Sequence, residues 1–229
     1  MSDQVPAHVG IILDGNRRWA KEHGLKSVEG HREGAEVFKK VSLAAFDRGV
    51  KYLSAFVFST ENWYRAKDEV SFLMKLIVRA VELHLDEFNK KNIKIVIVGS
   101  RDNVPSAALK AIERTEAKTA GNTGGTLGLC FNYGGKPELV DAIRQIVASG
   151  VGPAEIDDET VDAYLYQPQI PSMDLLIRTS GEHRTSGFMM WRADYAELCF
   201  VEKMWPDFTV EDFDEALADY AQRQRRFGK

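Results

Sequence analysis

The stretch from His8 to Trp19, HVGIILDGNRRW, decides the fold of this chain. It opens with an apolar run, Val9–Leu13, and the turn formers Asp14-Gly15-Asn16 follow directly. An apolar run of about four to eight residues that ends in turn formers is typical of a buried strand that passes into a loop. In open α/β sheets, ligands bind at the carboxyl ends of the strands. The carboxylate of Asp14 beside Arg17 and Arg18 therefore indicates a site for a metal-bound phosphate, and the alternative is a surface turn with a local ion pair.

The composition is that of a single globular domain, residues 1–229. The chain is 44% hydrophobic and 28% charged, with a formal net charge of −4. A nucleic-acid-binding protein usually presents a basic field, so this charge argues against a nucleic acid as partner. The N-terminus has no signal-peptide pattern, and no apolar run reaches the roughly 18 residues of a membrane helix. We therefore expect a cytoplasmic protein whose two thiols, Cys130 and Cys199, are reduced and buried.

Further strands and helices alternate along the rest of the chain. The patterns predict strands over 52–58, 94–98, 126–132, 174–177 and 197–201. They predict helices over 29–48, 68–92, 105–120, 137–148, 158–166 and 210–227, after a short helix or turn at 18–24. Such alternation is typical of the α/β class, so we expect a mostly parallel six-stranded sheet that helices cover on both faces.

The expected helix over 68–92 is apolar on more than one side. Val70, Leu73 and Ile77 belong to one stripe, and Phe72 and Leu76 belong to a second flank. A helix that is apolar beyond one stripe must bury two sides. One side belongs against the sheet, and the other needs a second helix, a partner subunit or an apolar ligand. Simple core packing is the alternative interpretation.

Polar clusters follow three of the expected strands, at 14–18, 59–65 and 178–186. The carboxyl ends of parallel strands lie at one edge of a sheet, so the three clusters should face one crevice. They contain the arginines that we expect to bind anions, namely Arg17, Arg18, Arg65, Arg178 and Arg184. One phosphate does not need so many guanidiniums, but two diphosphates would use them.

Several stretches together resemble the signature motifs of the cis-prenyltransferases. They are HVGIILDGNRRWA, GHREGAE, FSTENWYR, NYGGKPEL and DLLIRTSGEHRTSGFMMWRADYAELCF, and the resemblance runs from about residue 6 to residue 227. It implies a parallel sheet surrounded by helices, an apolar tunnel and a homodimer. It also implies a Mg²⁺-dependent enzyme that condenses isopentenyl diphosphate with an allylic diphosphate, with farnesyl diphosphate as the expected primer. The long cis-polyprenyl diphosphate product would be a carrier-lipid precursor, released through peripheral contact with a membrane.

The resemblance also assigns roles to matching positions. It implies that Asp14 binds Mg²⁺ and serves the chemistry, and that Asn62 assists removal of the proton. Because a neutral amide is a poor base, we expect Asn62 to orient the diphosphate or a water that receives the proton. Glu197 would be a second metal ligand, with His183 as its neighbour. The residues expected to bind the substrates are Gly15, Asn16, Arg17, Arg18, Trp19, His31, Ser59, Thr60, Glu61, Trp63, Arg65, Arg178, Arg184 and Ser186.

Some positions depart from the family pattern or extend it. Ser27 stands where bacterial members usually carry arginine, which puts one phosphate contact in doubt; Ala66 and Asp194 also depart from the pattern. The ending Arg226-Phe227-Gly228 resembles a family tail, and implies that Arg226 and Gly228 contact the isopentenyl diphosphate of the other subunit. Ala35 and Leu127 are our candidates for the wall and the floor of the tunnel.

Two other functions remain open on the sequence alone. A non-catalytic subunit of the same family would stabilise a partner, but such subunits lack the acid at the position of Asp14 and usually carry an N-terminal membrane segment. A generic phosphate-binding enzyme on a doubly wound sheet would have no apolar tunnel.

Overall fold

The computed structural model describes residues 5–223, and one six-stranded sheet organises them. The strands are β1 (His8–Ile12), β2 (Tyr52–Ser59), β3 (Ile93–Val98), β4 (Gly125–Tyr133), β5 (Leu175–Arg178) and β6 (Glu197–Phe200). Their order is β3-β4-β2-β1-β5-β6, and every neighbouring pair is parallel. The parallel α/β sheet expected from the sequence is confirmed, and its six strands lie where the apolar runs predict them.

Strand β1 lies inside the sheet, between β2 and β5, and all five of its residues are buried. Successive side chains of a strand point to opposite faces. Val9 and Ile11 join the apolar cluster on one face, whereas Ile12 joins the cluster on the other. Gly10 shares the face of Ile12, where a Cβ atom would lie 2.3 Å from the Met173 methyl group. Burial on both faces explains why β1 is an almost continuous apolar run.

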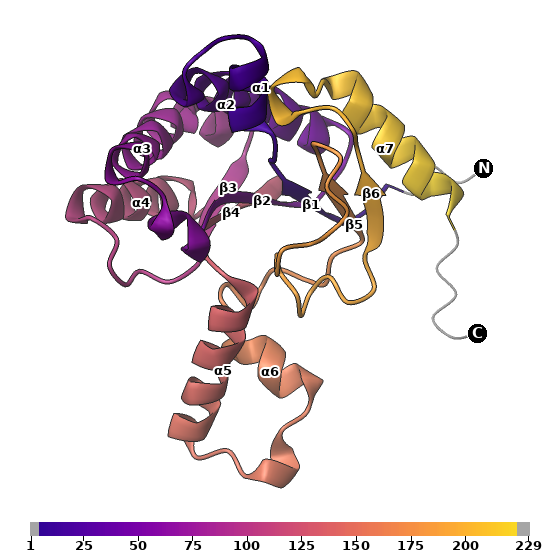
Figure 1. Cartoon of the computed structure of the whole chain (residues 1–229). Helices are drawn as coiled ribbons and strands as arrows, with labels where there is room; N and C mark the ends of the chain where they lie inside the picture. The colour runs from indigo at the N-terminus through magenta and orange to yellow at the C-terminus, as the bar shows by residue number, and fades with distance from the viewer. Residues whose placement is uncertain (1–4, 224–229) are drawn as a thin grey trace.

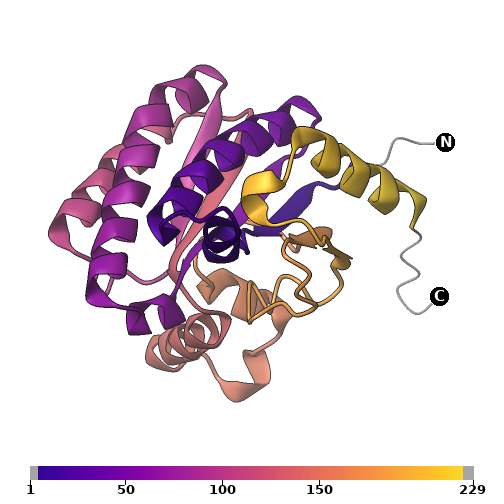
Figure 2. The same ribbon diagram turned by 45° about the horizontal axis from the view of Figure 1, so that its top comes forward.

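Helices pack against one face of the sheet (Figures 1 and 2). Helices α2 (Ser27–Asp47), α3 (Lys67–Lys90), α4 (Ser106–Thr119) and α7 (Val210–Gln222) all contribute buried side chains to the cluster that contains Val9 and Ile11. The short α1 (Asn16–Glu22) lies beside α2, and the 3₁₀ helices η1 (Thr60–Tyr64) and η3 (Trp205–Asp207) connect larger elements. None of the described helices is long and apolar enough to cross a membrane.

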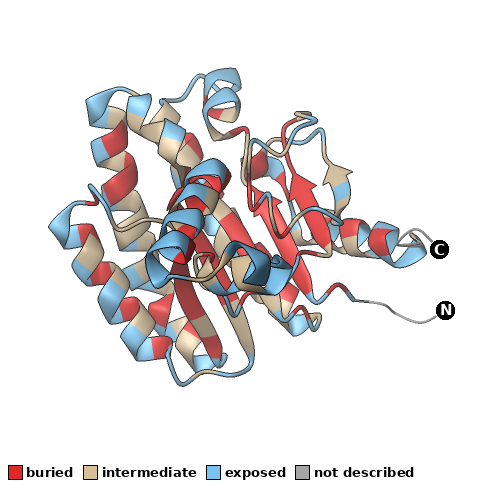
Figure 3. Cartoon of the chain, turned by 90° about the horizontal axis from the view of Figure 1, so that it is seen from below, coloured by how far each residue is buried: buried red, intermediate tan, exposed pale blue. Residues whose placement is uncertain are grey.

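The second face differs from the expectation of helical cover. It is covered largely by the chain on either side of β5, residues 165–174 and 179–196, where Ile170, Met173 and Phe188 pack on the sheet without forming a regular helix. Helix α5 (Gly135–Ser149), η2 (Pro153–Glu155) and α6 (Asp158–Tyr164) project below the sheet in Figure 1. Seen from below, the strands are mostly buried (Figure 3). Irregular segments lack the periodicity that reveals helices in a sequence, so this cover could not be predicted.

A buried ion pair fastens this irregular segment to α5. Arg192 Nη1 lies 3.0 Å from Glu138 Oε1, and both side chains are at most 3% exposed. The other groups of Arg192 donate to the carbonyls of Ile170 and Tyr166. The Tyr133 hydroxyl donates to the second oxygen of Glu138 at 2.5 Å. The pair therefore has the additional hydrogen bonds that a buried ion pair needs.

Candidate active site

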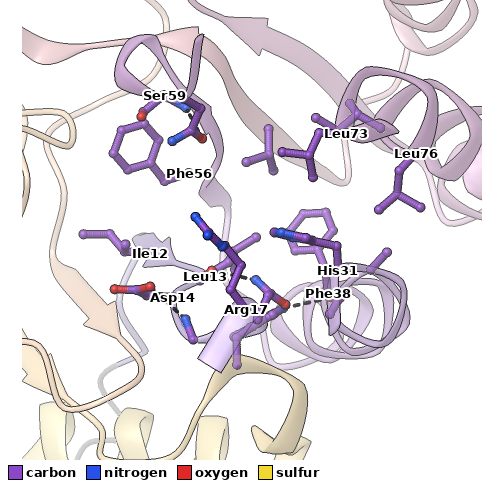
Figure 4. Close-up of a pocket in the computed structure, with 18 of the residues that line it drawn as sticks. Ile12, Leu13, Asp14, Arg17, His31, Phe38, Phe56, Ser59, Leu73 and Leu76 are labelled. Atoms are coloured by element: carbon purple, nitrogen blue, oxygen red, sulfur yellow. Dashed lines mark hydrogen bonds between the residues drawn. The ribbon is translucent and has the colours of Figure 1, made fainter. Parts of the chain in front are cut away.

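A cavity of about 860 Å³ opens at the carboxyl ends of β1 and β2, beneath α1, α2 and α3. Figure 4 shows Asp14 and Ser59 on one side of it, with Leu73 and Leu76 on the helix opposite. The polar residues that line it include Asp14, Arg17, Arg18, Arg65 and Arg178. The expectation that three polar strand ends meet in one crevice is thus satisfied, because these residues come from all three clusters.

The carboxylate of Asp14 is fixed by its neighbours at the end of β1. Arg178 Nη2 donates to Oδ2 at 2.8 Å, and the backbone N–H of Gly15 donates to Oδ1 at 2.8 Å. Gly15 has a φ of 108°, which a side chain would strain. Burial raises the pKa of Asp14, but the hydrogen bond and charge of Arg178, the Gly15 N–H and Arg18 outweigh it, so the net pKa is lowered. Asp14 is therefore ionised at neutral pH.

Arg178 is 4% exposed and reaches the cavity from the end of β5. Its Nη1 donates to Ser186 Oγ at 2.8 Å and to the Arg184 carbonyl at 2.5 Å. Arg18 donates to the carbonyl and hydroxyl of Ser180, and pairs with Glu182 at 3.1 Å. The end of β5 and the start of α1 thus hold each other's charged groups in place.

Glu69 is a member of the site that the sequence reasoning missed. Its carboxylate lies 3.0 Å from Arg65 Nη1 and 3.7 Å from Arg17 Nε, and it is only 16% exposed. Glu69 lies in the first turn of α3 and Arg65 lies just before that helix, so a charge pair four positions apart was the available signal. Glu69 therefore draws guanidiniums from two segments together beside the cavity.

Four side chains lining the cavity carry a buried polar atom without a hydrogen-bond partner among the described residues. The atoms are Asn16 Oδ1, Ser27 Oγ, His31 Nε2 and Arg178 Nε. An unpaired buried polar atom costs about 1–3 kcal/mol, so such atoms call for a functional explanation. Burial, then the charge of Arg65, lowers the pKa of His31 to about 4, so its imidazole is neutral. These atoms are suited to a polar ligand.

The segment from Ser59 to Arg65 divides into two groups. Ser59, Asn62 and Arg65 line the cavity, and Asn62 Oδ1 accepts from the Ser59 N–H at 3.2 Å. Trp63 instead turns to β4, where its indole N–H donates to Asn132 Oδ1 at 2.7 Å. Thr60 is near Gly134, and Glu61 is exposed.

Other expected site residues lie apart from the cavity lining. The Trp19 indole donates to Asp207 and stacks on His23. His183 is exposed, stacks on Phe200 and lies 3.9 Å from Glu202, and Arg184 pairs with Glu182. Arg226 and Gly228 lie outside the described residues.

Glu197 lies at the opposite end of the sheet from Asp14. It is level with Leu175 and hence with Val9, five positions before Asp14. At about 3.3 Å per residue, the strand from Val9 to Ile12 alone spans about 10 Å, and Asp14 lies beyond its end. Glu197 pairs with Arg223 at 3.0 Å instead. The two carboxylates therefore cannot share one ion within a single chain, and residues 5–223 contain no group of three potential metal ligands.

The inner part of the cavity is apolar. Helix α3 contributes Leu73, Leu76, Ile77 and Val81, and α2 contributes Ala35 and Phe38. Leu73 and Ile77 belong to the first apolar stripe of α3 and Leu76 belongs to its second flank, whereas Phe72 of that flank packs against the core. The cavity therefore borders part of each apolar side of α3. Ala35 lies in the wall as predicted, but Leu127 is in the core and Leu129, two residues further along β4, lines the cavity. A small cavity of about 20 Å³ lies behind, sharing Ile77, Val81 and Leu129 with the large one.

A carboxylate among arginines lies at the polar end of a cavity whose inner part is apolar, and such a lining suits a ligand with an anionic head and a hydrocarbon tail. Residues 12–228 match the family model described as putative undecaprenyl diphosphate synthase, and the chain belongs to this family of prenyltransferases.

Curated relatives of the chain span nearly its whole length. It is 44% identical to the isoprenyl transferase of Thermotoga maritima, over 98% of this chain and 97% of the relative. It is 42% identical to the (2E,6E)-farnesyl-diphosphate-specific ditrans,polycis-undecaprenyl-diphosphate synthase of Micrococcus luteus, over 98% of this chain and 92% of the relative.

Solved structures share the fold. Lavandulyl diphosphate synthase from Lavandula x intermedia, in complex with dimethylallyl diphosphate, aligns with a TM-score of 0.96 and 35% identity, covering 98% of this chain and 99% of that one. A probable undecaprenyl diphosphate synthase from Campylobacter jejuni aligns with a TM-score of 0.84 and 26% identity, covering 99% and 100%.

Proposed function

We propose that this protein is a cis-prenyltransferase that condenses isopentenyl diphosphate with an allylic diphosphate, and that its product is a long cis-polyprenyl diphosphate. The observation that carries the proposal is the division of one cavity into an arginine-rich end around Asp14 and an apolar end along α3. Such a cavity suits a molecule with a charged head and a growing hydrocarbon tail. A generic phosphate-binding enzyme would not need the apolar end.

The polar end would bind two diphosphates. Arg17, Arg18 and the unpaired groups of Asn16 and His31 would hold the allylic diphosphate. Arg178 and Ser186 would hold isopentenyl diphosphate with Arg184. Guanidiniums bind phosphate oxygens in pairs, which fixes the orientation of each head group.

Mg²⁺ fits the donors at this end of the cavity. Protein-bound Mg²⁺ is usually held by one or two carboxylates together with substrate phosphates and waters. Asp14 is ionised, 32% exposed and lines the cavity, so it would supply the carboxylate. The ion would neutralise part of the charge of the departing diphosphate.

Arginines would support the bond changes by stabilising charge. The C–O bond of the allylic diphosphate breaks, and the diphosphate leaves with the electron pair while Arg17 and Arg18 stabilise its charge. The double bond of isopentenyl diphosphate forms the new C–C bond, and a proton is lost to leave a cis olefin. Because Asn62 Oδ1 already accepts from Ser59, its NH₂ group would orient a diphosphate oxygen or the water that receives the proton.

The physiological setting is part of the same proposal. We place the enzyme in the cytoplasm as a homodimer, with farnesyl diphosphate as primer and a carrier-lipid precursor as product. Transient contact with a membrane would release the product. The relative from Micrococcus luteus, specific for (2E,6E)-farnesyl diphosphate, supports this choice of primer.

The test is a direct assay. Purified protein is incubated with Mg²⁺, labelled isopentenyl diphosphate and geranyl or farnesyl diphosphate, and the products are sized by chromatography. We expect Mg²⁺-dependent polyprenyl diphosphates that EDTA abolishes. Full activity in EDTA would refute the metal, and the absence of product with either primer would favour a non-catalytic subunit.

A further inference from the structure

Asn132 and Trp63 join two segments at the carboxyl edge of the sheet, and neither residue lines the cavity. The Trp63 indole N–H donates to Asn132 Oδ1 at 2.7 Å. Asn132 lies near the end of β4 and is 6% exposed, whereas Trp63 belongs to η1, which comes directly after β2. Strands β2 and β4 are neighbours in the sheet, so this bond attaches η1 to the end of β4.

The environment of Asn132 determines which way its amide faces. Its Nδ2 donates to the carbonyls of Ser100 and Asp102, at 2.9 and 3.0 Å. With both N–H donors engaged, the oxygen is the group that meets the indole. The backbone φ of 49° also suits asparagine, which enters the left-handed region more easily than most residues. A residue of another type would not make all three contacts at this position.

Trp63 in turn holds the segment that carries cavity residues. Its ring packs edge-on against Phe58 at 5.0 Å, inside the apolar cluster. Asn62 immediately precedes it and Arg65 lies two residues later, and both line the cavity. The positions of the Asn62 and Arg65 side chains therefore depend on the hydrogen bond between the Trp63 indole and β4.

We propose that Asn132 is a positioning residue for prenyl transfer, which acts through Trp63 by holding the 59–65 segment so that Asn62 and Arg65 face the substrates. This inference rests on the proposed function. Removal of one partner of a buried hydrogen bond leaves the other polar group unpaired. We expect the 59–65 segment to move so that this group finds another partner.

Two variants break the bond from opposite sides. Asn132→Gly removes the amide and still accepts a positive φ, whereas Trp63→Phe removes the N–H donor and keeps an aromatic ring on Phe58. We expect each to lower kcat/KM by about tenfold, the size of effect that a lost buried hydrogen bond produces. The double variant should be no worse than the more damaged single variant, because the two residues act through one bond.

Asn122→Gly is the matched control. Asn122 makes comparable side-chain bonds, to Asn89 Oδ1 at 3.0 Å and the Ile93 carbonyl at 2.8 Å, but at the amino end of β3 and β4. We expect it to lower the melting temperature without changing kcat/KM. If Asn132→Gly and Trp63→Phe lower kcat/KM no more than Asn122→Gly does, the positioning role is overturned.

A spectroscopic test is independent of activity. The four tryptophans give four indole ¹⁵N–¹H signals, and Trp63→Phe identifies the one from Trp63. In Asn132→Gly that signal should shift, while the Trp205 signal, from an indole that donates to the Gly34 carbonyl, stays in place. An unchanged Trp63 signal would overturn the inference. Wild-type protein that makes no product would instead refute the proposed function and leave this spectroscopic test valid.

Discussion

The guanidinium of Arg178 lies 2.8 Å from the carboxylate of Asp14, although 164 positions separate the two residues in the chain. Strands β1 and β5 are neighbours in the sheet, with Ile12 level with Arg178, so the fold itself makes this pair. Arg178 is enclosed by protein, whereas Asp14 is about a third exposed toward the cavity. The arginine can therefore fix the orientation of the carboxylate while the carboxylate meets the ligand.

Removing the charge of Asp14 should stop turnover while the fold persists. Asp14→Asn keeps the size of the side chain but loses the negative charge that would hold Mg²⁺. We expect turnover to fall by at least ~10²-fold, because electrostatic stabilisation of the departing diphosphate is lost. The assay is incorporation of labelled isopentenyl diphosphate, with circular dichroism as the check on folding. Asp47→Asn, at a carboxylate that pairs with Lys91 on the surface, is the control. Near-normal turnover in Asp14→Asn would contradict the role.

The buried imidazole of His31 should make stability depend on pH. Its pKa in the folded protein is lowered by burial and by Arg65 from the usual 6.5 to about 4. Between these values the unfolded chain binds the proton and the folded chain does not, so stability falls as pH decreases from 6.5 to 4. His8, also lowered to about 4 by burial, contributes in the same direction.

Urea unfolding at a series of pH values measures this slope. His31→Gln should reduce the slope by the share of one histidine and leave the share of His8. Titration of the His31 ring protons by NMR provides a second measurement, in which added inorganic diphosphate should raise the pKa, since an adjacent anion favours the imidazolium. An unchanged slope in His31→Gln would show that the imidazole is accessible to protons in the folded state.

Residues of the cavity wall should set the length of the product. Ala35→Leu adds bulk to the wall and should shorten the polyprenyl chains, whereas Leu129→Ala should lengthen them by joining the cavity to the small one behind it. Leu127→Ala, in the core away from the lining, should lower stability and leave the product ladder unchanged. Reversed-phase separation of labelled products measures the ladder. If Ala35→Leu and Leu129→Ala gave the same product lengths as the wild-type protein, Ala35 and Leu129 would not control the length of the product.

Replacement of one partner of the Glu138–Arg192 ion pair should greatly lower the free energy of unfolding. Arg192→Met leaves the carboxylate of Glu138 buried without its partner, and we expect a loss of about 3–5 kcal/mol in the free energy of unfolding. Adding Glu138→Gln should recover part of that loss, because the buried charge is then gone. Arg144→Met, which breaks a surface pair with Asp141, should cost about 0–1 kcal/mol. Equal losses for the buried and surface variants in urea unfolding would contradict this assignment.

Local sequence patterns were enough to predict the sheet. Apolar runs such as Val9–Leu13 and Tyr52–Phe58 mark strands that are buried on both faces. Strands buried in this way are typical of the interior of a parallel sheet. The meeting of Asp14 with Arg178 followed from the same rule, because parallel strands end at one edge. The prediction of the site at this edge therefore depended on topology as much as on motifs.

Features fixed by tertiary packing could not be predicted in this way. The residues on either side of β5, 165–174 and 179–196, cover a sheet face without a helical period, and their attachment depends on Arg192 reaching Glu138 across 54 positions. Glu197 stands at the start of β6 and Asp14 follows the end of β1. The rule for parallel strands places the two at opposite ends of the sheet, whereas the resemblance to the family assigned both to one metal. The Trp63 indole reaches Asn132 because β2 and β4 are neighbours in the sheet. Neither the sequence around Trp63 nor the sequence around Asn132 shows which strands are neighbours.

The cavity lies within the same apolar cluster that joins α2 and α3 to the sheet, and it shares with that cluster Phe38, Leu73 and Ile77. Side chains that border a cavity have protein neighbours on one side only, and they gain dispersion energy from any slender hydrocarbon that enters. A guest bound by the folded state alone raises the melting temperature by mass action. Folding of the protein and binding of a hydrocarbon chain in the cavity are thus thermodynamically coupled. The melting temperature should rise with the alkyl chain length of a bound detergent until the chain is too long for the cavity.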